Sequence, residues 1–234
     1  NTVEFGTGDK AVKIGGENVF PLYSFDAAIE NAPKVGIEIT DFGMEHEPEC
    51  IKKYYEGCAT LADMARKAAS MEGVDFLSFR MEGGDPNGAN KSTEELIGEL
   101  KEIADAVDLP LVVCGCKNVE KDAELFSKAA EALNGKNAVI LSAKEENYKT
   151  VGAAAGLAYK QIVGAESAVD INLAKQLNVL ISQLGVDSKS VVMNVGSAAV
   201  GYGFEYVIST MDRVKAAALQ QGDANLQMPI ITPV

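Results

Sequence analysis

Residues 109–150 read LPLVVCGCKNVEKDAELFSKAAEALNGKNAVILSAKEENYKT and carry the clearest fold signal in the chain. Two apolar runs, Pro110–Gly115 and Ala138–Leu141, have the length and composition of buried strands. Between them, apolar residues recur every fourth position from Leu125 to Leu133, which places them on one face of a helix. Two buried strands joined through a helix lie parallel to each other. The segment therefore predicts a βαβ unit.

The same alternation of strand and helix continues along most of the chain. Further strands are predicted at Val35–Ile39, Val74–Phe79, Gln161–Gly164, Ser190–Asn194 and Met228–Ile231. Helices are expected around Ile51–Met71, Leu96–Val107, Val151–Tyr159 and Val169–Leu184. Residues Gly196–Tyr206 are expected to form a glycine-rich turn that enters a further helix. This rhythm predicts an α/β fold, a (β/α)8 TIM barrel that stops after its seventh strand. We therefore expect the natural gene product to be longer, by roughly 60 to 80 residues at the C-terminus.

The first residues follow a different pattern. Short apolar runs at Val3–Phe5, Ala11–Ile14 and Val19–Leu22 are separated by glycines, as in a β-hairpin. We expect residues 1–31 to form a hairpin-like extension and residues 32–234 to form the barrel domain. The extension could act as a plug or as an edge for a partner.

Polar residues mark several expected helix starts. Ser92 with Glu95, and Ser167 with Asp170, have capping-box spacing, in which two side chains satisfy exposed amides. Asn118 is also a natural N-cap residue.

Composition excludes several classes of function. The net charge of −13 argues against nucleic-acid binding, which needs clustered cations. No apolar run has the roughly 18 residues of a membrane span. The single histidine, His46, excludes a zinc site that needs several histidines and makes a nucleophilic triad unexpected. We interpret the four cysteines as reduced thiols of a cytoplasmic protein. Because they lie in two close pairs, an iron-sulfur cluster held by all four thiolates is a less favoured alternative.

The candidate binding residues lie in loops that follow the carboxyl ends of strands, where α/β proteins build their sites. They are Asp85, Asn90, Asn147, Tyr148, Asp170, Asn172, Gly201, Tyr202 and Gly203. Acidic and amide groups in such number could orient a polar, nitrogen-rich ligand. Most of them also have a structural explanation as turn or cap residues, and the two glycines around Tyr202 could serve either a neighbouring strand or a flat ligand.

Several motifs together resemble one known family. They are Lys13–Gly16, Gly84–Asn90, Pro110–Asp122, Glu145–Lys149, Asp170–Asn172, Lys175–Asn178, Gly201–Tyr206 and Gln227–Ile230. In this order they resemble the small (delta) subunit of the corrinoid iron-sulfur protein of acetyl-CoA synthase/CO dehydrogenase systems, also called acetyl-CoA decarbonylase/synthase complexes. The resemblance covers nearly the whole chain.

The resemblance implies a non-catalytic barrel subunit that pairs with a larger subunit carrying cobalamin and a 4Fe–4S cluster. In such a pair, the corrinoid receives a methyl group from methyl-tetrahydropterin through a methyltransferase. It passes that group to acetyl-CoA synthase in the Wood-Ljungdahl pathway. The small subunit would cap the corrinoid at the interface and hold no cluster itself, so the chemistry would belong to the cofactor.

Two other functions stay open at this point. The chain could be a free-standing pterin-dependent methyltransferase in which Asp85, Asn90 and Asp170 hold the pterin. It could also be an architectural scaffold that contacts its complex through residues 1–31. Affinity for methyl-pterin would identify the enzyme, and deletion of the extension would identify the scaffold.

Overall fold

A parallel sheet forms the centre of the molecule in the computed structural model, which describes residues 1–20, 23 and 25–233. Its strands follow one another in chain order: β3 (Gly36–Thr40), β4 (Phe76–Arg80), β5 (Leu111–Cys114), β6 (Val139–Ala143), β7 (Ile162–Glu166) and β8 (Val191–Asn194). Met193 adds an isolated parallel bridge to Ile230, at the position of the predicted seventh strand. The prediction of parallel strands that alternate with helices is confirmed.

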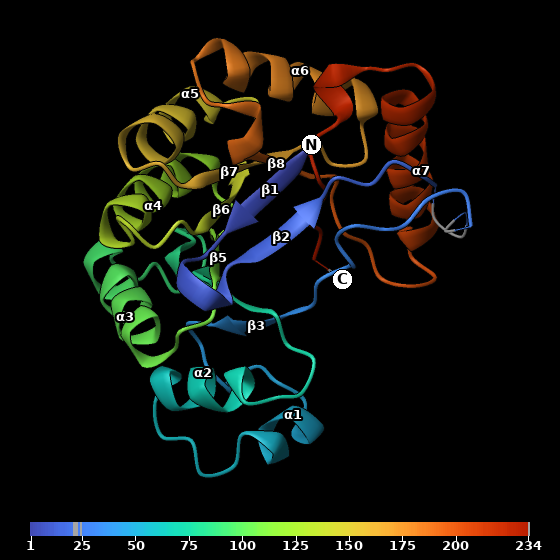
Figure 1. Cartoon of the computed structure of the whole chain (residues 1–234). Coiled ribbons are helices and arrows are strands. Elements are labelled where there is room, and N and C mark those ends of the chain that lie inside the picture. The colour runs from blue at the N-terminus through green and yellow to red at the C-terminus, as the bar shows by residue number, and fades with distance from the viewer. Residues whose placement is uncertain (21–22, 24, 234) are drawn as a thin grey trace.

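Helices surround the sheet in an arc (Figure 1). They are α1 (Glu49–Tyr54), α2 (Leu61–Ala69), α3 (Thr93–Ala106), α4 (Val119–Ala132), α5 (Tyr148–Val151), α6 (Ile171–Gln183) and α7 (Phe204–Gln220), with a π-helix over Gly152–Ala158. Single 3-10 turns lie at Gly8–Lys10, Glu82–Gly84, Ser188–Ser190 and Ala224–Leu226. The fold is a (β/α) barrel that is open, among the described residues, between β3 and the segment around Ile230.

Alternate residues of the central strands face two different cores. Leu111 and Val113 of β5 belong to the larger core, which the helices cover. Val112 and Cys114 point the other way, into the barrel interior. The continuous apolar run that predicted this strand therefore reflects burial on both faces.

A hairpin closes the amino-terminal end of the barrel. Its strands, β1 (Thr2–Phe5) and β2 (Val12–Gly15), pair antiparallel and bury Val3, Phe5 and Val12 in the interior core. The Gly6 amide donates to the Asn137 carbonyl at 2.7 Å, just before β6. Gly6 has φ +84°, and a Cβ there would lie 2.5 Å from the Pro110 ring. The hairpin therefore plugs its own barrel.

A buried glutamine joins three elements at the same end. The Gln161 side chain, which is fully buried, accepts from the Ala138 amide at 2.6 Å. Its amide group donates to the carbonyls of Leu133 at 3.0 Å and Tyr159 at 3.3 Å. One side chain thus connects the starts of β6 and β7 to the end of α4.

Two predicted helices have different limits in the structure. The helix expected over Ile51–Met71 is divided into α1 and α2, because Gly57 has φ +88° and Thr60 starts a new helix. Thr60 forms a reciprocal capping box with Asp63, a signal that the sequence interpretation missed.

The prediction of a capping box from Ser167 to Asp170 is wrong. Asp170 is itself the N-cap of α6 and accepts from the amides of Asn172 and Leu173. Ala168 and Val169 have φ +45° and +70°, so no helix can run through them. Val169 is consequently 37% exposed and not part of the buried stripe.

Candidate functional site at the carboxyl end of the barrel

Asp85 and Asn90 lie in the loop between β4 and α3, where their hydrogen bonds are local. The Asp85 carboxylate accepts from the Asn87 backbone amide at 2.9 Å and from its side chain at 3.2 Å. The Asp85 carbonyl accepts from the amides of Gly88 and Asn90. Asn90 has φ +51°, a conformation that asparagine tolerates well. Both residues therefore shape this loop.

Asn147 and Tyr148 follow β6. Asn147 is 5% exposed; its Oδ1 accepts from the Lys144 amide at 2.8 Å and its Nδ2 donates to the Val119 carbonyl at 3.2 Å. Asn147 has the N-cap position of α5 without a side-chain cap bond. Tyr148 is partly buried against the larger core. Asn147 thus ties this loop to the start of α4, and its side-chain polar groups are occupied.

The predicted residues after β7 also serve their own helix. Asp170 Oδ1 accepts from the Asn172 amide at 2.8 Å and from the Leu173 amide at 3.2 Å. An N-cap aspartate accepts hydrogen bonds from the free amides of the first helical turn, and its negative charge is favourable at the positive end of the helix dipole. Asn172 is exposed on the first turn of α6.

The loop between β8 and α7 is different, because it exposes apolar side chains. Tyr202 is 89% exposed and Val200 is 83% exposed, and Tyr206, in the first turn of α7, is 67% exposed. Gly201 and Gly203 flank Tyr202 with φ +81° and +115°, so the loop turns sharply on both sides of it. We call Val200, Tyr202 and Tyr206 the carboxyl-end patch. Large exposed apolar side chains that cluster in this way are typical of a contact surface.

A set of polar residues lies at the same end of the barrel, on interior-facing positions of the strands or, for Ser142 and Lys144, at the end of β6 and directly after it. We call it the inner rim; its members are Glu38, Arg80, Ser142, Lys144, Glu166 and Asn194. Arg80 donates to Glu38 through two bonds, at 2.7 Å and 2.9 Å. Desolvation of Arg80 opposes its charge, but the bonds to Glu38 outweigh it and the pKa of Arg80 is raised. This pair is therefore charged and fixed in orientation.

The other half of the inner rim comes from β6 to β8. Glu166 and Asn194 are register partners, and Asn194 donates to Ser142 Oγ at 2.9 Å. Lys144 lies 3.5 Å from Glu166. Asn194 and Ser142 are each 5% exposed.

The sequence interpretation missed the strand residues of the inner rim because it sought candidate residues in loops only. A signal was present, since Glu38, Arg80 and Glu166 interrupt strand sequences that are otherwise apolar. In a strand, residues two apart share a face, so Arg80 lies on the same face as Phe76 of the interior core. A charged residue on that face predicts a polar barrel mouth.

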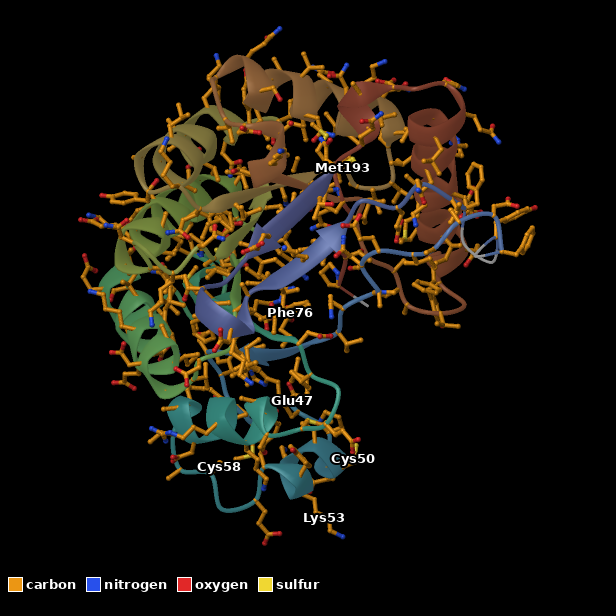
Figure 2. The ribbon with its side chains drawn as sticks, in the orientation of Figure 1. Glu47, Cys50, Lys53, Cys58, Phe76 and Met193 are labelled. Atoms are coloured by element: carbon orange, nitrogen blue, oxygen red, sulfur yellow. The ribbon has the colours of Figure 1, made fainter. Side chains whose placement is uncertain are left out.

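The buried cysteines carry no reactive thiolate. Burial raises the pKa of Cys114 to about 11 and the pKa of Cys116 to about 11. Figure 2 shows Cys50 and Cys58 beside α1, at the periphery of the molecule. Within the described residues, no group of three or more histidine, cysteine or acidic side chains is arranged to hold a metal ion.

A buried ion pair holds the loop that carries Asp85. The Asp41 carboxylate, which is fully buried, lies 3.0 Å from Lys91 Nζ and accepts from the Gly83 amide at 2.9 Å. Lys91 also donates to Glu99 Oε1 at 3.1 Å. Glu99 Oε2 is buried without a hydrogen-bond partner. Burial raises the pKa of Glu99 above its ordinary value, despite the attraction of Lys91.

Substitution of Glu99 by glutamine should change how stability depends on pH. The raised pKa means that the folded protein holds the Glu99 proton more strongly than the unfolded chain does. Glu99 therefore favours folding below its ordinary pKa of 4.5 and disfavours it as the pH rises through the folded value. Glu99→Gln should be more stable than wild type at pH 7.5 and lose that advantage toward pH 5. Urea unfolding at both pH values measures this, with the exposed Glu102→Gln as control. An advantage for Glu99→Gln that does not change with pH would contradict it.

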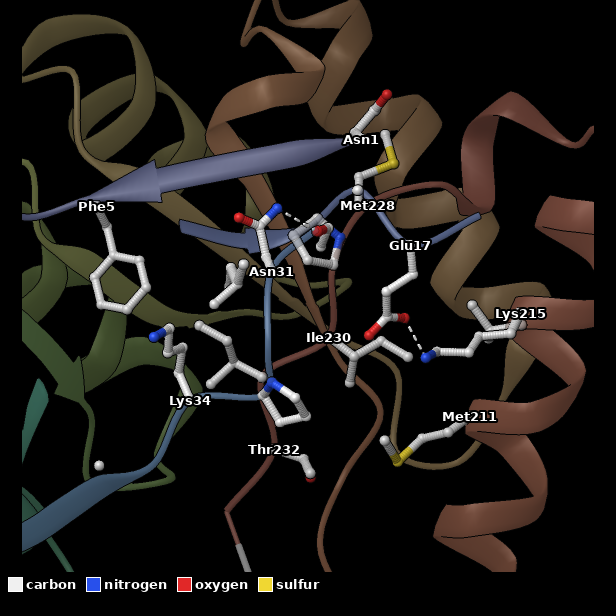
Figure 3. A pocket seen from close by; sticks show the side chains of 18 of the residues that line it. Asn1, Phe5, Glu17, Asn31, Lys34, Met211, Lys215, Met228, Ile230 and Thr232 are labelled. Atoms are coloured by element: carbon white, nitrogen blue, oxygen red, sulfur yellow. Dashed lines mark hydrogen bonds and ion pairs between the residues drawn. The ribbon is translucent and has the colours of Figure 1, made fainter. Parts of the chain in front are cut away.

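A cavity of about 770 Å³ opens on the side of the barrel between β3 and the segment around Ile230 (Figure 3). Its wall is largely apolar. Several of its polar residues are already engaged: Lys34 with Asp75, Lys215 with Glu17, and Asn31 with the Gly15 carbonyl. The cavity thus marks the open side of the barrel and presents few free polar groups.

The sequence matches the model of a known protein family over almost its whole length. The family model of the CO dehydrogenase/acetyl-CoA synthase delta subunit matches residues 2–233. The chain belongs to this family. The resemblance inferred from the sequence motifs is therefore confirmed, and the polar barrel mouth described above is that of a delta-subunit barrel.

Individual relatives agree with the family assignment. The acetyl-CoA decarbonylase/synthase complex subunit delta of Methanothermobacter thermautotrophicus is 33% identical over 231 residues, which cover 97% of this chain and 58% of the relative. That of Methanopyrus kandleri is 34% identical over 227 residues, 96% of this chain and 56% of the relative. The chain thus spans a little over half the length of these relatives.

Among solved structures, a phosphonomutase-like protein from Burkholderia cenocepacia is similar with a TM-score of 0.44 and 14% identity. The match covers 85% of this chain and 86% of that one. Among the described residues, no helix combines the length and apolar character needed to cross a bilayer.

Proposed function

We propose that this chain is the barrel part of a non-catalytic delta subunit that caps a corrinoid carried by a larger, cluster-bearing subunit. Membership of the delta-subunit family over residues 2–233 is the observation that supports this most directly. The corrinoid, when bound at the interface, supplies a cobalt centre that carries a methyl group. A methyl-tetrahydropterin methyltransferase and acetyl-CoA synthase would be the further partners, in the cytoplasm.

The residues at the carboxyl end fit such a role. The carboxyl-end patch offers exposed aromatic and aliphatic side chains, which suit a large flat macrocycle or the protein around it. The inner rim offers hydrogen-bonding groups without a set of metal ligands. A cap of this kind limits access of water to a reactive centre, which is a physical reason for a barrel subunit without catalytic residues.

The free-standing methyltransferase is supported less well. Asp85 and Asp170 were its proposed pterin ligands, and both carboxylates accept hydrogen bonds from nearby backbone amides. A pterin would have to compete with these local bonds. In the scaffold alternative, one face of the hairpin is already used, since Val3, Phe5 and Val12 are buried in the barrel, and only its outer face, with Glu4 and Lys13, is exposed.

Tyr202→Ser should weaken corrinoid capping without unfolding the barrel. Tyr202 is 89% exposed, so its removal costs little stability, whereas a contact residue of this size contributes on the order of 1–2 kcal/mol to binding. The measurement is the affinity of the chain for the corrinoid-loaded large subunit, together with urea unfolding. Tyr23→Ser is the matched control, because Tyr23 is also exposed but lies in the segment between β2 and β3. Equal affinities for wild type and Tyr202→Ser would count against the capping face.

A further inference from the structure

The inner rim differs from an anion-binding site in its balance of charge. Each of its two cations faces a carboxylate: Arg80 bonds Glu38 at 2.7 Å and 2.9 Å, and Lys144 lies 3.5 Å from Glu166. A phosphate or carboxylate ligand would have to displace one of these carboxylates. At Arg80, such a ligand would have to break both hydrogen bonds to Glu38, and the Arg80 side chain is only 16% exposed. The rim therefore disfavours anionic groups.

The arc from β6 to β8 can instead accommodate a neutral polar group. Lys144 and Glu166 are 27% and 28% exposed, and their separation of 3.5 Å is longer than a good charge-assisted hydrogen bond. The Ser142 hydroxyl accepts from Asn194 and still has its own hydrogen to donate. The arc thus presents donors beside an acceptor. A primary amide matches this set, because its oxygen accepts and its nitrogen donates.

These observations lead to an inference that rests on the proposed function. We propose that Lys144 and Glu166 recognise a peripheral carboxamide of the corrinoid, and that the nucleotide tail with its phosphate is not recognised by this chain. Lys144 donates to the carboxamide oxygen and Glu166 accepts from its nitrogen, so the amide bridges the ion pair. The inner rim then determines which side of the macrocycle faces the barrel.

Ligand variants test this directly. The whole chain is dialysed to equilibrium against aquacobalamin, against cobinamide, which lacks the nucleotide tail, and against cobalamin derivatives with one peripheral amide hydrolysed to a carboxylic acid. Visible difference spectra provide a second readout. Cobinamide should bind within about twofold of aquacobalamin, and at least one acid derivative should bind about tenfold more weakly, equivalent to about 1.4 kcal/mol. Loss of binding with cobinamide would overturn the inference, because the tail would then be the recognised part.

Protein variants complete the test. Lys144→Met should weaken aquacobalamin binding about tenfold, the loss expected for one charge-assisted hydrogen bond. Glu166→Gln leaves Lys144 without its carboxylate and should therefore improve binding of the affected acid derivative relative to wild type. Lys149→Met and Glu145→Gln change the same residue types on the exposed surface and should have no effect.

The results distinguish a failure of the proposed function from a failure of the carboxamide inference alone. If wild type binds none of the three corrinoids, alone or with the large subunit, the proposed function fails and the inference fails with it. If wild type binds but Lys144→Met and Glu166→Gln bind equally well, only the inference is overturned. Urea unfolding of each variant shows whether a loss of binding comes from a loss of folded protein.

Discussion

Gln161→Leu should lower the free energy of unfolding by about 2–4 kcal/mol, which is a large part of the stability of an ordinary domain. The substitution keeps the volume of the side chain but removes its hydrogen bonds. The Ala138 amide loses its 2.6 Å acceptor, and the Leu133 carbonyl loses its 3.0 Å donor. The buried Ala138 amide is then left unpaired, which costs about 1–3 kcal/mol. The Leu133 carbonyl keeps its bond from the Lys136 amide at 2.9 Å, so its loss is only that of one hydrogen bond, about 1 kcal/mol. Urea unfolding followed by circular dichroism measures the effect.

Two further variants separate this explanation from a general sensitivity to mutation. Gln176→Leu replaces an exposed glutamine on α6 and should change stability by less than about 0.5 kcal/mol. Gln161→Glu keeps an acceptor for Ala138 but places a second oxygen toward the carbonyls of Leu133 and Tyr159. It should therefore be unstable at pH 7.5 and recover in part at acidic pH, where a protonated carboxyl can donate. A loss below about 1 kcal/mol for Gln161→Leu would show that water replaces the side chain.

Asp41→Ala should lower the free energy of unfolding by about 3–5 kcal/mol, the range observed when one partner of a buried ion pair is removed. The substitution leaves Lys91 without its fully buried counter-ion and leaves the Gly83 amide without an acceptor. A Cβ at Gly83 would lie 2.2 Å from Asp41 Oδ2, so the loop approaches this carboxylate as closely as glycine allows. The whole β4–α3 loop should loosen, which hydrogen exchange of residues 81–91 would detect.

A double-mutant cycle isolates the pair itself. Lys91→Met keeps the aliphatic part of the side chain and removes the charge. If Asp41 and Lys91 interact as described, the double variant should be more stable than the sum of the single losses implies. Asp41→Asn is the conservative comparison, because it can still accept from Gly83. Additive losses would show that Asp41 acts through the loop backbone alone.

The regular part of the fold could be predicted from the sequence because its signals are local. The continuous apolar run at Leu111–Cys114 indicates a buried strand, and the apolar residues repeated every fourth position on α4 indicate a helix. Each strand forms where an apolar run was found. Thr60 shows a limit of the same reasoning. Its capping box with Asp63 was present in the sequence, but the apolar period over Ile51–Met71 outweighed it.

The candidate site was harder to predict, because its chemistry depends on which face of a strand each residue occupies. Asp85, Asn147 and Asp170 are polar loop residues, and the structure shows that each satisfies nearby backbone amides. Tyr202, in contrast, is as exposed as a contact residue should be. Glu166 and Asn194 became visible as neighbours only through the register of β7 and β8, which involves residues far apart in the sequence.

The hairpin that closes the barrel has a consequence for the order of folding. Asn137 Nδ2 donates to the Glu4 carbonyl at 3.0 Å and to the Gly6 carbonyl at 3.3 Å, across 133 and 131 residues. Contacts over such separations require the closure of very long loops, whereas each βα unit closes a short one. We therefore expect the hairpin of β1 and β2 to pack late in folding, after β5 to β8 have formed the surface that it contacts.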